Sequence, residues 1–207
     1  HCPATEILKE GSVFDVLDQL KEEGLIRHYG VSVESVEEGL ICLEYPNVAS
    51  LQVIFNMFRQ KPLEELIPKA YQQGVGIITR VPLASGLLTG KFTTKTQFAE
   101  DDHRKFNENG EAFNVGETFS GLGFQKGVEL SDQLTWIKEG RSSMASAALR
   151  WILDAKEISC INPGFRNVTQ VKQNLEALDT KSFTEDENLK IKNFYKEKVK
   201  DAIMGTY

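Results

Sequence analysis

The sequence predicts an α/β protein built on a parallel sheet, and two observations indicate this. The first three apolar, strand-like runs recur at intervals of roughly 25 residues, and segments with helical apolar spacing separate them. Right-handed β–α–β units show this alternation. Four strands with intervening helices are compatible with half of a β/α barrel and with a doubly wound sheet. Composition and periodicity do not separate these two architectures.

The elements follow from local patterns along the chain. Strands are expected at residues 25–33, 50–58, 75–81 and 157–162. Helices are expected at residues 12–23, 34–45, 62–74, 131–140, 142–155, 168–178 and 184–199, the last of them capped, charged and external. The first helix has Ser12 as a candidate N-cap, an apolar face that includes Val13 and Val16, and Gly24 as its stop. Residues 82–127 have little sustained periodicity, and such long loops are usually functional or disordered.

Composition limits the classes of function. The chain has 207 residues, 41% of them apolar and 26% charged, which suits one globular domain spanning 1–207. Its net charge of -6 argues against nucleic acid or an anionic membrane as a partner. No apolar run approaches the roughly 18 residues of a membrane span, and no signal peptide opens the chain.

The cysteines and histidines point to no metal site. Three widely separated cysteines, Cys2, Cys42 and Cys160, suit reduced, packed thiols and a cytoplasmic protein. The three histidines have no helical i, i+4 pairing, so we expect no zinc. Residue 1 is a histidine rather than a methionine, and we therefore expect an N-terminally truncated fragment.

Two turns are suited to binding an anion. The stretch "CINPGFRNVTQVKQN" (160–174) ends a strand in Pro-Gly and starts a helix, so that free N–H groups and Arg166 face outwards. In "GLLTGKF" (86–92) the glycines and the nearby Ser85 allow close approach to a phosphate. It is not a P-loop, because the glycine spacing is wrong and Phe92 replaces the required Ser or Thr. No strand is followed by G-x-G-x-x-G.

Five stretches in combination resemble the aldo-keto reductase superfamily. They are "HCP" (1–3), "LIRHYGVSVE" (25–34), "SLQVIFNMF" (50–58), "PLASGLLTGKF" (82–92) and "INPGFRNVTQVKQN" (161–174). The resemblance implies an eight-stranded (β/α)8 TIM barrel of which this chain supplies the second half, from the end of strand four onward. It also implies NADPH as cofactor and an aldehyde or ketone as the small-molecule substrate.

The resemblance assigns roles residue by residue. His1 matches the histidine that orients the substrate carbonyl, and Ser32 and Gln52 match residues that bind the nicotinamide carboxamide. The remaining cofactor residues implied are those of the pyrophosphate loop, Pro82, Leu83, Ser85, Gly86, Lys91 and Arg104, and those of the adenosine end, Gly164, Arg166, Gln170, Gln173 and Asn174. For Arg104, a solvated surface charge is at least as good an interpretation as a role in binding the cofactor. Arg166 is expected to pair with the adenosine 2′-phosphate.

The sequence departs from the family pattern at two positions. Val33 follows Ser32 where many members have Asn, and Arg80 stands where many have an aromatic residue that stacks on the nicotinamide. Arg80 could stack through its planar guanidinium or contact the pyrophosphate. The family's catalytic Tyr, Lys and Asp lie in the first half of the barrel and have no counterpart in this chain.

Three functions are therefore weighed. The favoured one is an NADPH-dependent reductase whose first half lies outside this sequence, with the fragment inactive alone and prone to associate or unfold. The alternative is a non-catalytic NADP-binding or regulatory module, similar to the reductase-like subunits of potassium channels. A phosphate-binding aldolase barrel would need a lysine at a strand end, and no expected strand ends in one.

Overall fold

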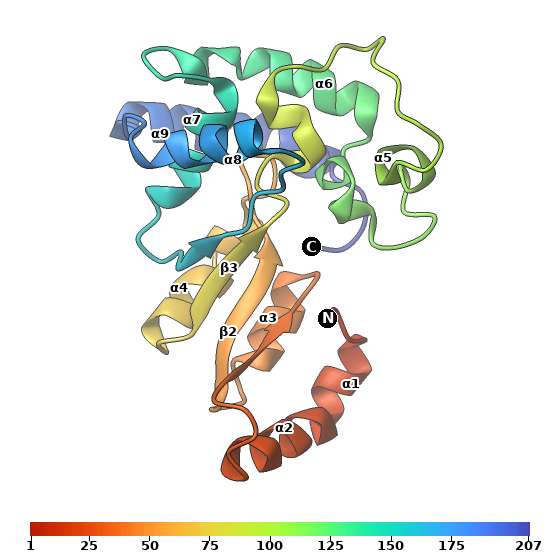
Figure 1. Cartoon of the computed structure of the whole chain (residues 1–207), viewed down its shortest axis with the longest axis vertical. Coiled ribbons are helices and arrows are strands. Elements are labelled where there is room, and N and C mark those ends of the chain that lie inside the picture. The colour runs from red at the N-terminus through yellow and green to blue at the C-terminus, as the bar shows by residue number, and fades with distance from the viewer.

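The computed structural model describes residues 1–207 and is organised around a four-stranded parallel sheet (Figure 1). The strands lie side by side in chain order. They are β1 (Tyr29–Ser32), β2 (Val48–Ile54), β3 (Gly76–Arg80) and β4 (Cys160–Ile161). The four strands predicted from the sequence are therefore present, in the order that a β/α barrel requires.

All the crossovers lie on one face of this sheet. Each strand is added on the same side of the one before it. When all the connections are right-handed, this order places every connecting helix on the same face of the sheet. Burial agrees, because Leu51, Val53 and Ile77 on the helical face are at most 2% exposed. On the opposite face, Gln52 and Ile78 are half-buried, and only Ile54 and Arg80 at the carboxyl ends of β2 and β3 are buried. A doubly wound sheet would bury both faces, so the sheet is of the TIM-barrel type.

The N-terminal part differs from expectation at the first helices. Helix α1 (Thr5–Glu10), which was not predicted, precedes α2 (Ser12–Glu22). Ser12 is not a cap, because Gly11 at a φ of 85° forms the junction and the serine side chain makes no capping hydrogen bond. The predicted apolar face is wrong at Val13 and Val16, which are exposed, but Leu17 of the same predicted face packs against the core, as does the buried Phe14.

All four strands are shorter than predicted, and local hydrogen bonds explain the ends of two of them. Strand β2 stops at Ile54 because Asn56 Oδ1 accepts the Phe58 N–H at 2.9 Å and turns the chain. Strand β1 starts only at Tyr29, because the N–H groups of Leu25 and Ile26 bond back to Leu20 at the end of α2. Gly24, at a φ of 74°, ends that helix as expected.

The next helices pack against the sheet. They are α3 (Val36–Cys42) and α4 (Leu66–Gln72), the latter preceded by a 3-10 turn at Lys61–Leu63 that contains Pro62. Ser35 closes a capping box with Glu38 at the start of α3. Gly39 is required inside α3, because a Cβ there would lie 2.6 Å from the Leu66 side chain.

The long segment 82–127 is ordered by short turns. It holds 3-10 turns at Ala84–Thr89, Val115–Glu117 and Phe119–Gly121, and the short helix α5 (His103–Phe106). Helix α6 (Phe124–Gln133) begins earlier than predicted, and residues 135–138 form a 3-10 turn instead of continuing the helix expected at 131–140. Gly127 lies inside α6, where a Cβ would meet Leu87 at 2.4 Å.

The C-terminal part adds three helices. They are α7 (Met144–Leu153), α8 (Val168–Leu175) and α9 (Glu185–Phe194), and a π-helical turn at Tyr195–Val199 continues α9. Ser143 and Thr184 close capping boxes on α7 and α9. No helix is both long and apolar enough to cross a bilayer.

Exposed apolar side chains gather near the two open edges of the sheet. They belong to α1, α2 and the following turn, and to α8 and its flanking turns. They are Ile7, Val13, Val16 and Leu25 at one end, and Phe165, Val168, Leu175 and Leu178 at the other. The edges themselves are β1 and β4, each of which pairs on one side. Cys160 on β4 is exposed, which corrects its prediction as a packed thiol, whereas Cys42 is buried.

We predict that the Ser35→Ala substitution lowers the free energy of unfolding by about 1 kcal/mol, because the Glu38 N–H loses its capping acceptor. The measurement is urea unfolding followed by far-UV circular dichroism. Ser12→Ala is the matched control and should change stability by less than about 0.5 kcal/mol, since that serine is exposed and caps nothing. Equal losses from the two substitutions would contradict the assignment of Ser35 as the functioning cap.

Candidate active site and cofactor site

The carboxyl ends of β1 and β2 bring together the first predicted residues. The Cys2 N–H donates to the Ser32 carbonyl at 3.0 Å, which places exposed His1 beside the end of β1. Ser32 and Gln52 are paired in register, and the serine hydroxyl lies 3.4 Å from Gln52 Oε1. These two side chains therefore form a half-buried polar pair on the face of the sheet that carries no helices.

Arg80 ends β3 next to this pair and is 5% exposed. Its guanidinium forms an ion pair with Glu117 and donates to the Val33 carbonyl at 2.8 Å. The same Nη2 lies 3.3 Å from the Cys2 sulfur. Nε is buried without a partner. Both Nη atoms are thus committed to the protein, and Nε is the donor left for another group.

The turn after β3 has an unusual backbone. Val81, Ala84 and Ser85 have φ values of 53°, 49° and 56°, which L-residues adopt at a cost. The Ser85 hydroxyl donates to the Glu117 carbonyl at 2.9 Å and accepts the Phe119 N–H at 3.0 Å. This bridge holds the turn to the 3-10 segments at 115–121 and offsets the strain.

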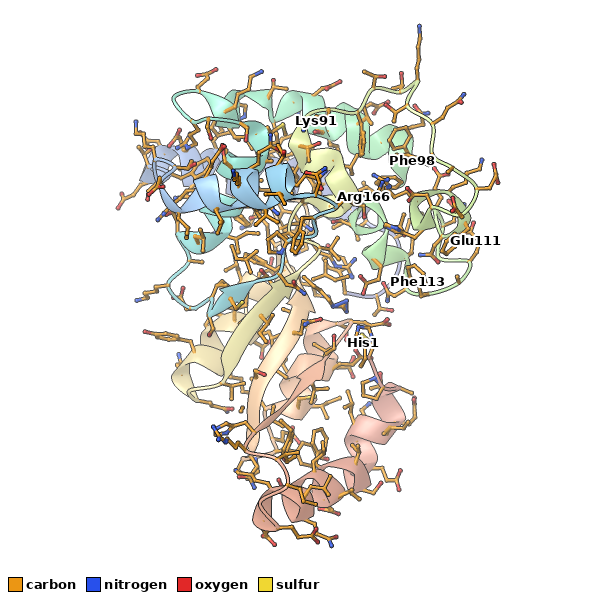
Figure 2. The ribbon with its side chains drawn as sticks, viewed as in Figure 1. His1, Lys91, Phe98, Glu111, Phe113 and Arg166 are labelled. Carbon is orange, nitrogen blue, oxygen red and sulfur yellow. The ribbon has the colours of Figure 1, made fainter.

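The other predicted residues of that loop have different surroundings. Pro82 is buried and Leu83 is half-buried. Gly86 lies against Phe92, whose ring would be 2.8 Å from an added Cβ. Lys91 is exposed in the upper, helical part of the molecule, where Figure 2 also shows Arg166.

Asp102 links the loop to the turn after β4. It accepts hydrogen bonds from the Arg104 backbone N–H at 3.0 Å and from Arg104 Nε at 2.9 Å, and it lies 3.5 Å from Arg166 Nη2. These bonds from Arg104 hold the pKa of Asp102 well below its ordinary value. The Arg104 guanidinium also lies 4.4 Å from the centre of the Phe98 ring, so Arg104 is not a solvated surface charge.

The turn from β4 into α8 is held by its own side chains. Asn167 caps α8 by accepting the Gln170 N–H at 2.9 Å. Gln170 Oε1 accepts the Arg166 N–H at 2.6 Å, and Asn174 donates to the Gly164 carbonyl at 3.3 Å. An added Cβ at Gly164 would meet nothing within 4 Å. The Arg166 side chain is 75% exposed, so it extends from a fixed turn into open space.

Apart from the five residues of the turn after β3 (Pro82, Leu83, Ser85, Gly86 and Lys91), the predicted residues fall into two groups. The first, at the ends of β1 to β3, contains His1, Ser32, Gln52 and Arg80. The second, around the turn after β4, contains Arg104, Gly164, Arg166, Gln170 and Asn174, with Gln173 exposed on α8. Figure 2 shows His1 apart from Arg166, on the side of α1. Segment 82–127 lies between the two groups, because Glu117 pairs with Arg80 and Asp102 contacts Arg166.

Sequence reasoning missed a buried cation, Arg59. This residue is 1% exposed and donates to the Thr206 carbonyl at 3.1 Å and to the Ser120 carbonyl at 3.4 Å. Burial lowers the pKa of Arg59 to about 10. Glu117 and Asp102 were missed as well, and the acidic residues beside the basic ones in "DDHR" (101–104) were the available signal for Asp102.

The fold is of the β/α-barrel type, and the two groups of residues lie at the carboxyl ends of its strands. Residues 3–196 match the Aldo/keto reductase family, and the chain belongs to this family. It is 24% identical over 192 residues to an uncharacterized oxidoreductase, YqkF, of Bacillus subtilis (strain 168), covering 91% of this chain and 56% of that protein. It is 27% identical over 131 residues, 60% of this chain and 37% of the other, to a probable voltage-gated potassium channel subunit beta of Arabidopsis thaliana.

A solved structure agrees in fold. The glycerol dehydrogenase AKR11B4 from Gluconobacter oxydans superposes with a TM-score of 0.68 at 27% identity, covering 98% of this chain and 57% of that one. The chain thus spans about half the length of the relatives it matches. These similarities confirm the superfamily predicted from the sequence.

We predict that Asp102→Asn loosens the segment between Phe98 and Phe113, because the ionised acceptor of Arg104 is lost. Chymotryptic cleavage within that segment should become about ten-fold faster, since charge-assisted hydrogen bonds of this kind are worth about 1.5–3 kcal/mol. Asp101→Asn, at an exposed neighbour without an ion pair, is the control and should cleave at the original rate.

The stabilisation that Asp102 contributes depends on pH in a direction that its pKa shift determines. Because folding lowers the pKa of Asp102, its contribution is complete above the unfolded value of about 3.9 and is lost as the pH falls through the lower folded value. His103 Nδ1 lies 3.5 Å from Asp102, so the rates are compared above about pH 8, where histidine side chains are ordinarily neutral, and their ratio should stay constant between about pH 8 and 9. A ratio near one, or one that changes across this range, would contradict the assignment.

Proposed function

We propose that the chain is the cofactor-binding second half of the barrel of an NADPH-dependent reductase that converts an aldehyde or ketone into an alcohol. The observation that carries this proposal is Arg166. It is an exposed guanidinium on a turn that its own side chains hold rigid, at the N-terminus of α8. Such a site suits a phosphate dianion, which separates NADP from NAD.

The adenosine end fits the cofactor well. Gly164 leaves open space next to Arg166, and Gln170 and Asn174 fix the backbone around both residues. Gln170 and Asn174 support the site through the backbone, because their amides already bond to the turn. Asp102 lies 3.5 Å from Arg166 and opposes a phosphate there, so the 75% exposed guanidinium has to turn its free edge away from this carboxylate to bind one.

The nicotinamide end also fits, through fewer groups. Ser32 and Gln52 present a hydroxyl and an amide side by side on the open face of the sheet. The unpartnered Nε of Arg80 supplies one further donor. A partnerless buried N–H costs free energy, which a ligand acceptor would recover. Arg80 takes the place of the family's stacking residue as a donor, since its Nη atoms are bound to Glu117 and Val33.

The mechanism assigns limited roles to this chain. The bound cofactor supplies a hydride for the carbonyl carbon. His1 orients the carbonyl oxygen at the carboxyl end of β1, and the Ser32–Gln52 pair orients the nicotinamide ring. Protonation of the developing alkoxide requires an acid. The family's tyrosine acid, with its lysine and aspartate, belongs to the half of the barrel that this chain lacks.

The half-barrel proposal accounts for the exposed apolar residues. Those of α1, α2 and α8 lie near the two open sheet edges, where the other half of a barrel would cover them. A cytoplasmic location is proposed as well, because three unpaired cysteines suit a reducing compartment.

A second candidate is a non-catalytic NADP-binding or regulatory module. The similarity to a probable potassium channel subunit beta supports it. Coding sequence upstream of His1 separates the two candidates. An open frame carrying the Tyr and Lys supports the reductase, and a stop codon followed directly by a start signal supports the module.

We predict that Arg166→Ala weakens binding of 2′,5′-ADP by about ten-fold and leaves 5′-AMP binding unchanged, because one charge-assisted contact to the 2′-phosphate is lost. These two nucleotides occupy only the adenosine end, so calorimetry on the chain is sufficient. Lys172→Gln removes an exposed cation from α8 and is the control for overall charge. Equal weakening of both nucleotides by Arg166→Ala would reject the NADP assignment.

We further predict that residues 1–207 alone oxidise no NADPH in the presence of aldehydes such as glyceraldehyde. The absorbance of NADPH at 340 nm, a property of the reagent, measures this directly. The reason is the missing acid, so added chain carrying the first half of the barrel should restore turnover. Turnover by residues 1–207 alone would show that an acid is present within them.

A further inference from the structure

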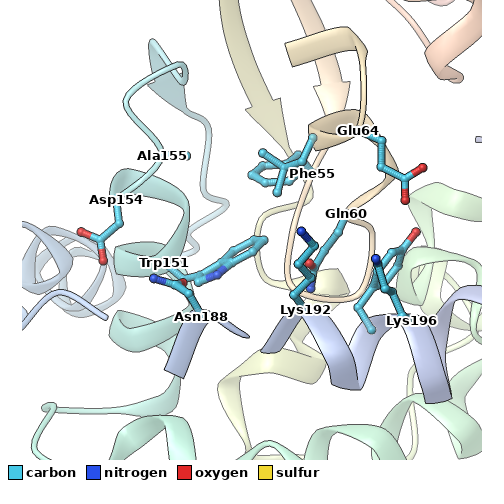
Figure 3. Close-up of a pocket in the computed structure, with 11 residues that line it drawn as sticks. Phe55, Gln60, Glu64, Trp151, Asp154, Ala155, Asn188, Lys192 and Lys196 are labelled. Atoms are coloured by element: carbon cyan, nitrogen blue, oxygen red, sulfur yellow. The ribbon is translucent and has the colours of Figure 1, made fainter. Parts of the chain in front are cut away.

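A cavity of about 620 Å³ lies between the turn after β2 and the helices α7 and α9, and none of the residues of the two groups described above lines it (Figure 3). This volume is in the usual range for a small-molecule site. Its lining residues come from the turn after β2, the end of α7, and α9 with its π-helical continuation. They are Phe55, Gln60, Leu63, Glu64, Trp151, Asp154, Ala155, Asn188, Lys192, Tyr195 and Lys196.

The apolar part of the lining is aromatic. The rings of Phe55 and Trp151 are stacked, with centroids 5.2 Å apart. Phe55 is fully buried, Tyr195 is 2% exposed and Trp151 is 8% exposed, so the surrounding core holds these rings in place. Flat, rigid aromatic walls favour a planar ligand over a branched aliphatic one.

The free charge around the cavity is positive. Asp154 is paired with Arg150 at 2.7 Å and accepts the Phe183 N–H at 2.9 Å. Glu64 is paired with Lys200 at 3.2 Å. Lys192 and Lys196 take part in no ion pair.

The two lysines stand four residues apart on the same helical element. Figure 3 shows both at the rim of the cavity, on the side of Gln60. Ammonium groups so placed bind a single negative charge between them.

The backbone that carries part of this rim is unusual. Residues Tyr195–Val199 form a π-helical turn directly after α9. Single π-helical turns cost stability and are frequent at functional sites. The turn presents Tyr195 and Lys196 to the same cavity, and the Tyr195 hydroxyl is held 3.1 Å from the Tyr207 hydroxyl.

We infer that this cavity is a binding site for a small planar aromatic carboxylate. The ring lies against Trp151, whose indole is stacked on the fully buried Phe55, and the carboxylate is held by Lys192 and Lys196. The site is separate from the proposed cofactor site and shares no residue with it. Evidence against the proposed reductase function would therefore not be evidence against this site.

The test is calorimetric titration of the chain with 2-naphthoate and with the neutral 2-naphthalenemethanol. The carboxylate should bind about ten-fold more tightly than the alcohol, and the K192Q/K196Q double variant should lose this difference. Lys198→Gln is the matched control, because Lys198 bonds to Gln133 and does not line the cavity. The single variants K192Q and K196Q are each expected to bind 2-naphthoate about three-fold more weakly. They keep the test valid if the double variant is too unstable to titrate.

Tryptophan fluorescence locates the bound ring. The chain has two tryptophans, so Trp136→Phe leaves Trp151 as the reporter. Naphthoate should quench the remaining emission in Trp136→Phe and should have little effect on the emission that remains in Trp151→Phe. Absence of naphthoate binding, unchanged affinity in the lysine variants, or quenching of Trp136 instead of Trp151 would each overturn the proposal.

Discussion

The buried guanidinium of Arg59 is the constraint on which the upper part of the molecule depends. A charge that is 1% exposed is tolerated only where partners replace water. Arg59 finds them in the carbonyls of Ser120 and Thr206 and in the Tyr207 ring, 4.8 Å away. Segment 82–127 and the C-terminus therefore meet at one cation that follows β2. Gly116 has no side chain for the same reason, since a Cβ there would lie 2.0 Å from Arg59 Nη1.

A second buried cation extends this arrangement to the site. The nearby charges of Arg80 and Glu117 act in opposite directions on the pKa of Arg59, the arginine lowering it and the glutamate raising it. Glu117 pairs directly with Arg80, so one carboxylate compensates two guanidinium groups. The end of β3 thus becomes rigid at the point where a ligand would approach. Rigid donors cost little reorganisation when a ligand binds.

The sequence predicted the repeating units because their signals are local. Periodicity, the capped start of the last helix at Thr184 and the glycine after α2 are determined within a few residues. It did not predict the end of β2, because Phe55–Phe58 continue the apolar pattern and Asn56 turns the chain through its own side chain. In the site, the turn after β4 could be predicted from Pro-Gly and Arg166. The pairings of Arg80 with Glu117 and of Asp102 with Arg166 join residues 37 and 64 positions apart, which no local pattern encodes.

The open face of the sheet explains why the proposed function divides into cofactor binding and catalysis. Its first row consists of Gly30, Ser50 and Gly76, and the next contains Ser32, Gln52 and Ile78. Small residues in a sheet interior leave volume that larger side chains from opposite strands fill in a barrel. The adenosine end needs no such complement, because β4, α8 and segment 82–127 build it within residues 1–207. Under the proposed function, cofactor recognition would therefore precede completion of the barrel, whereas hydride transfer, which would need an acid across the open face, would not.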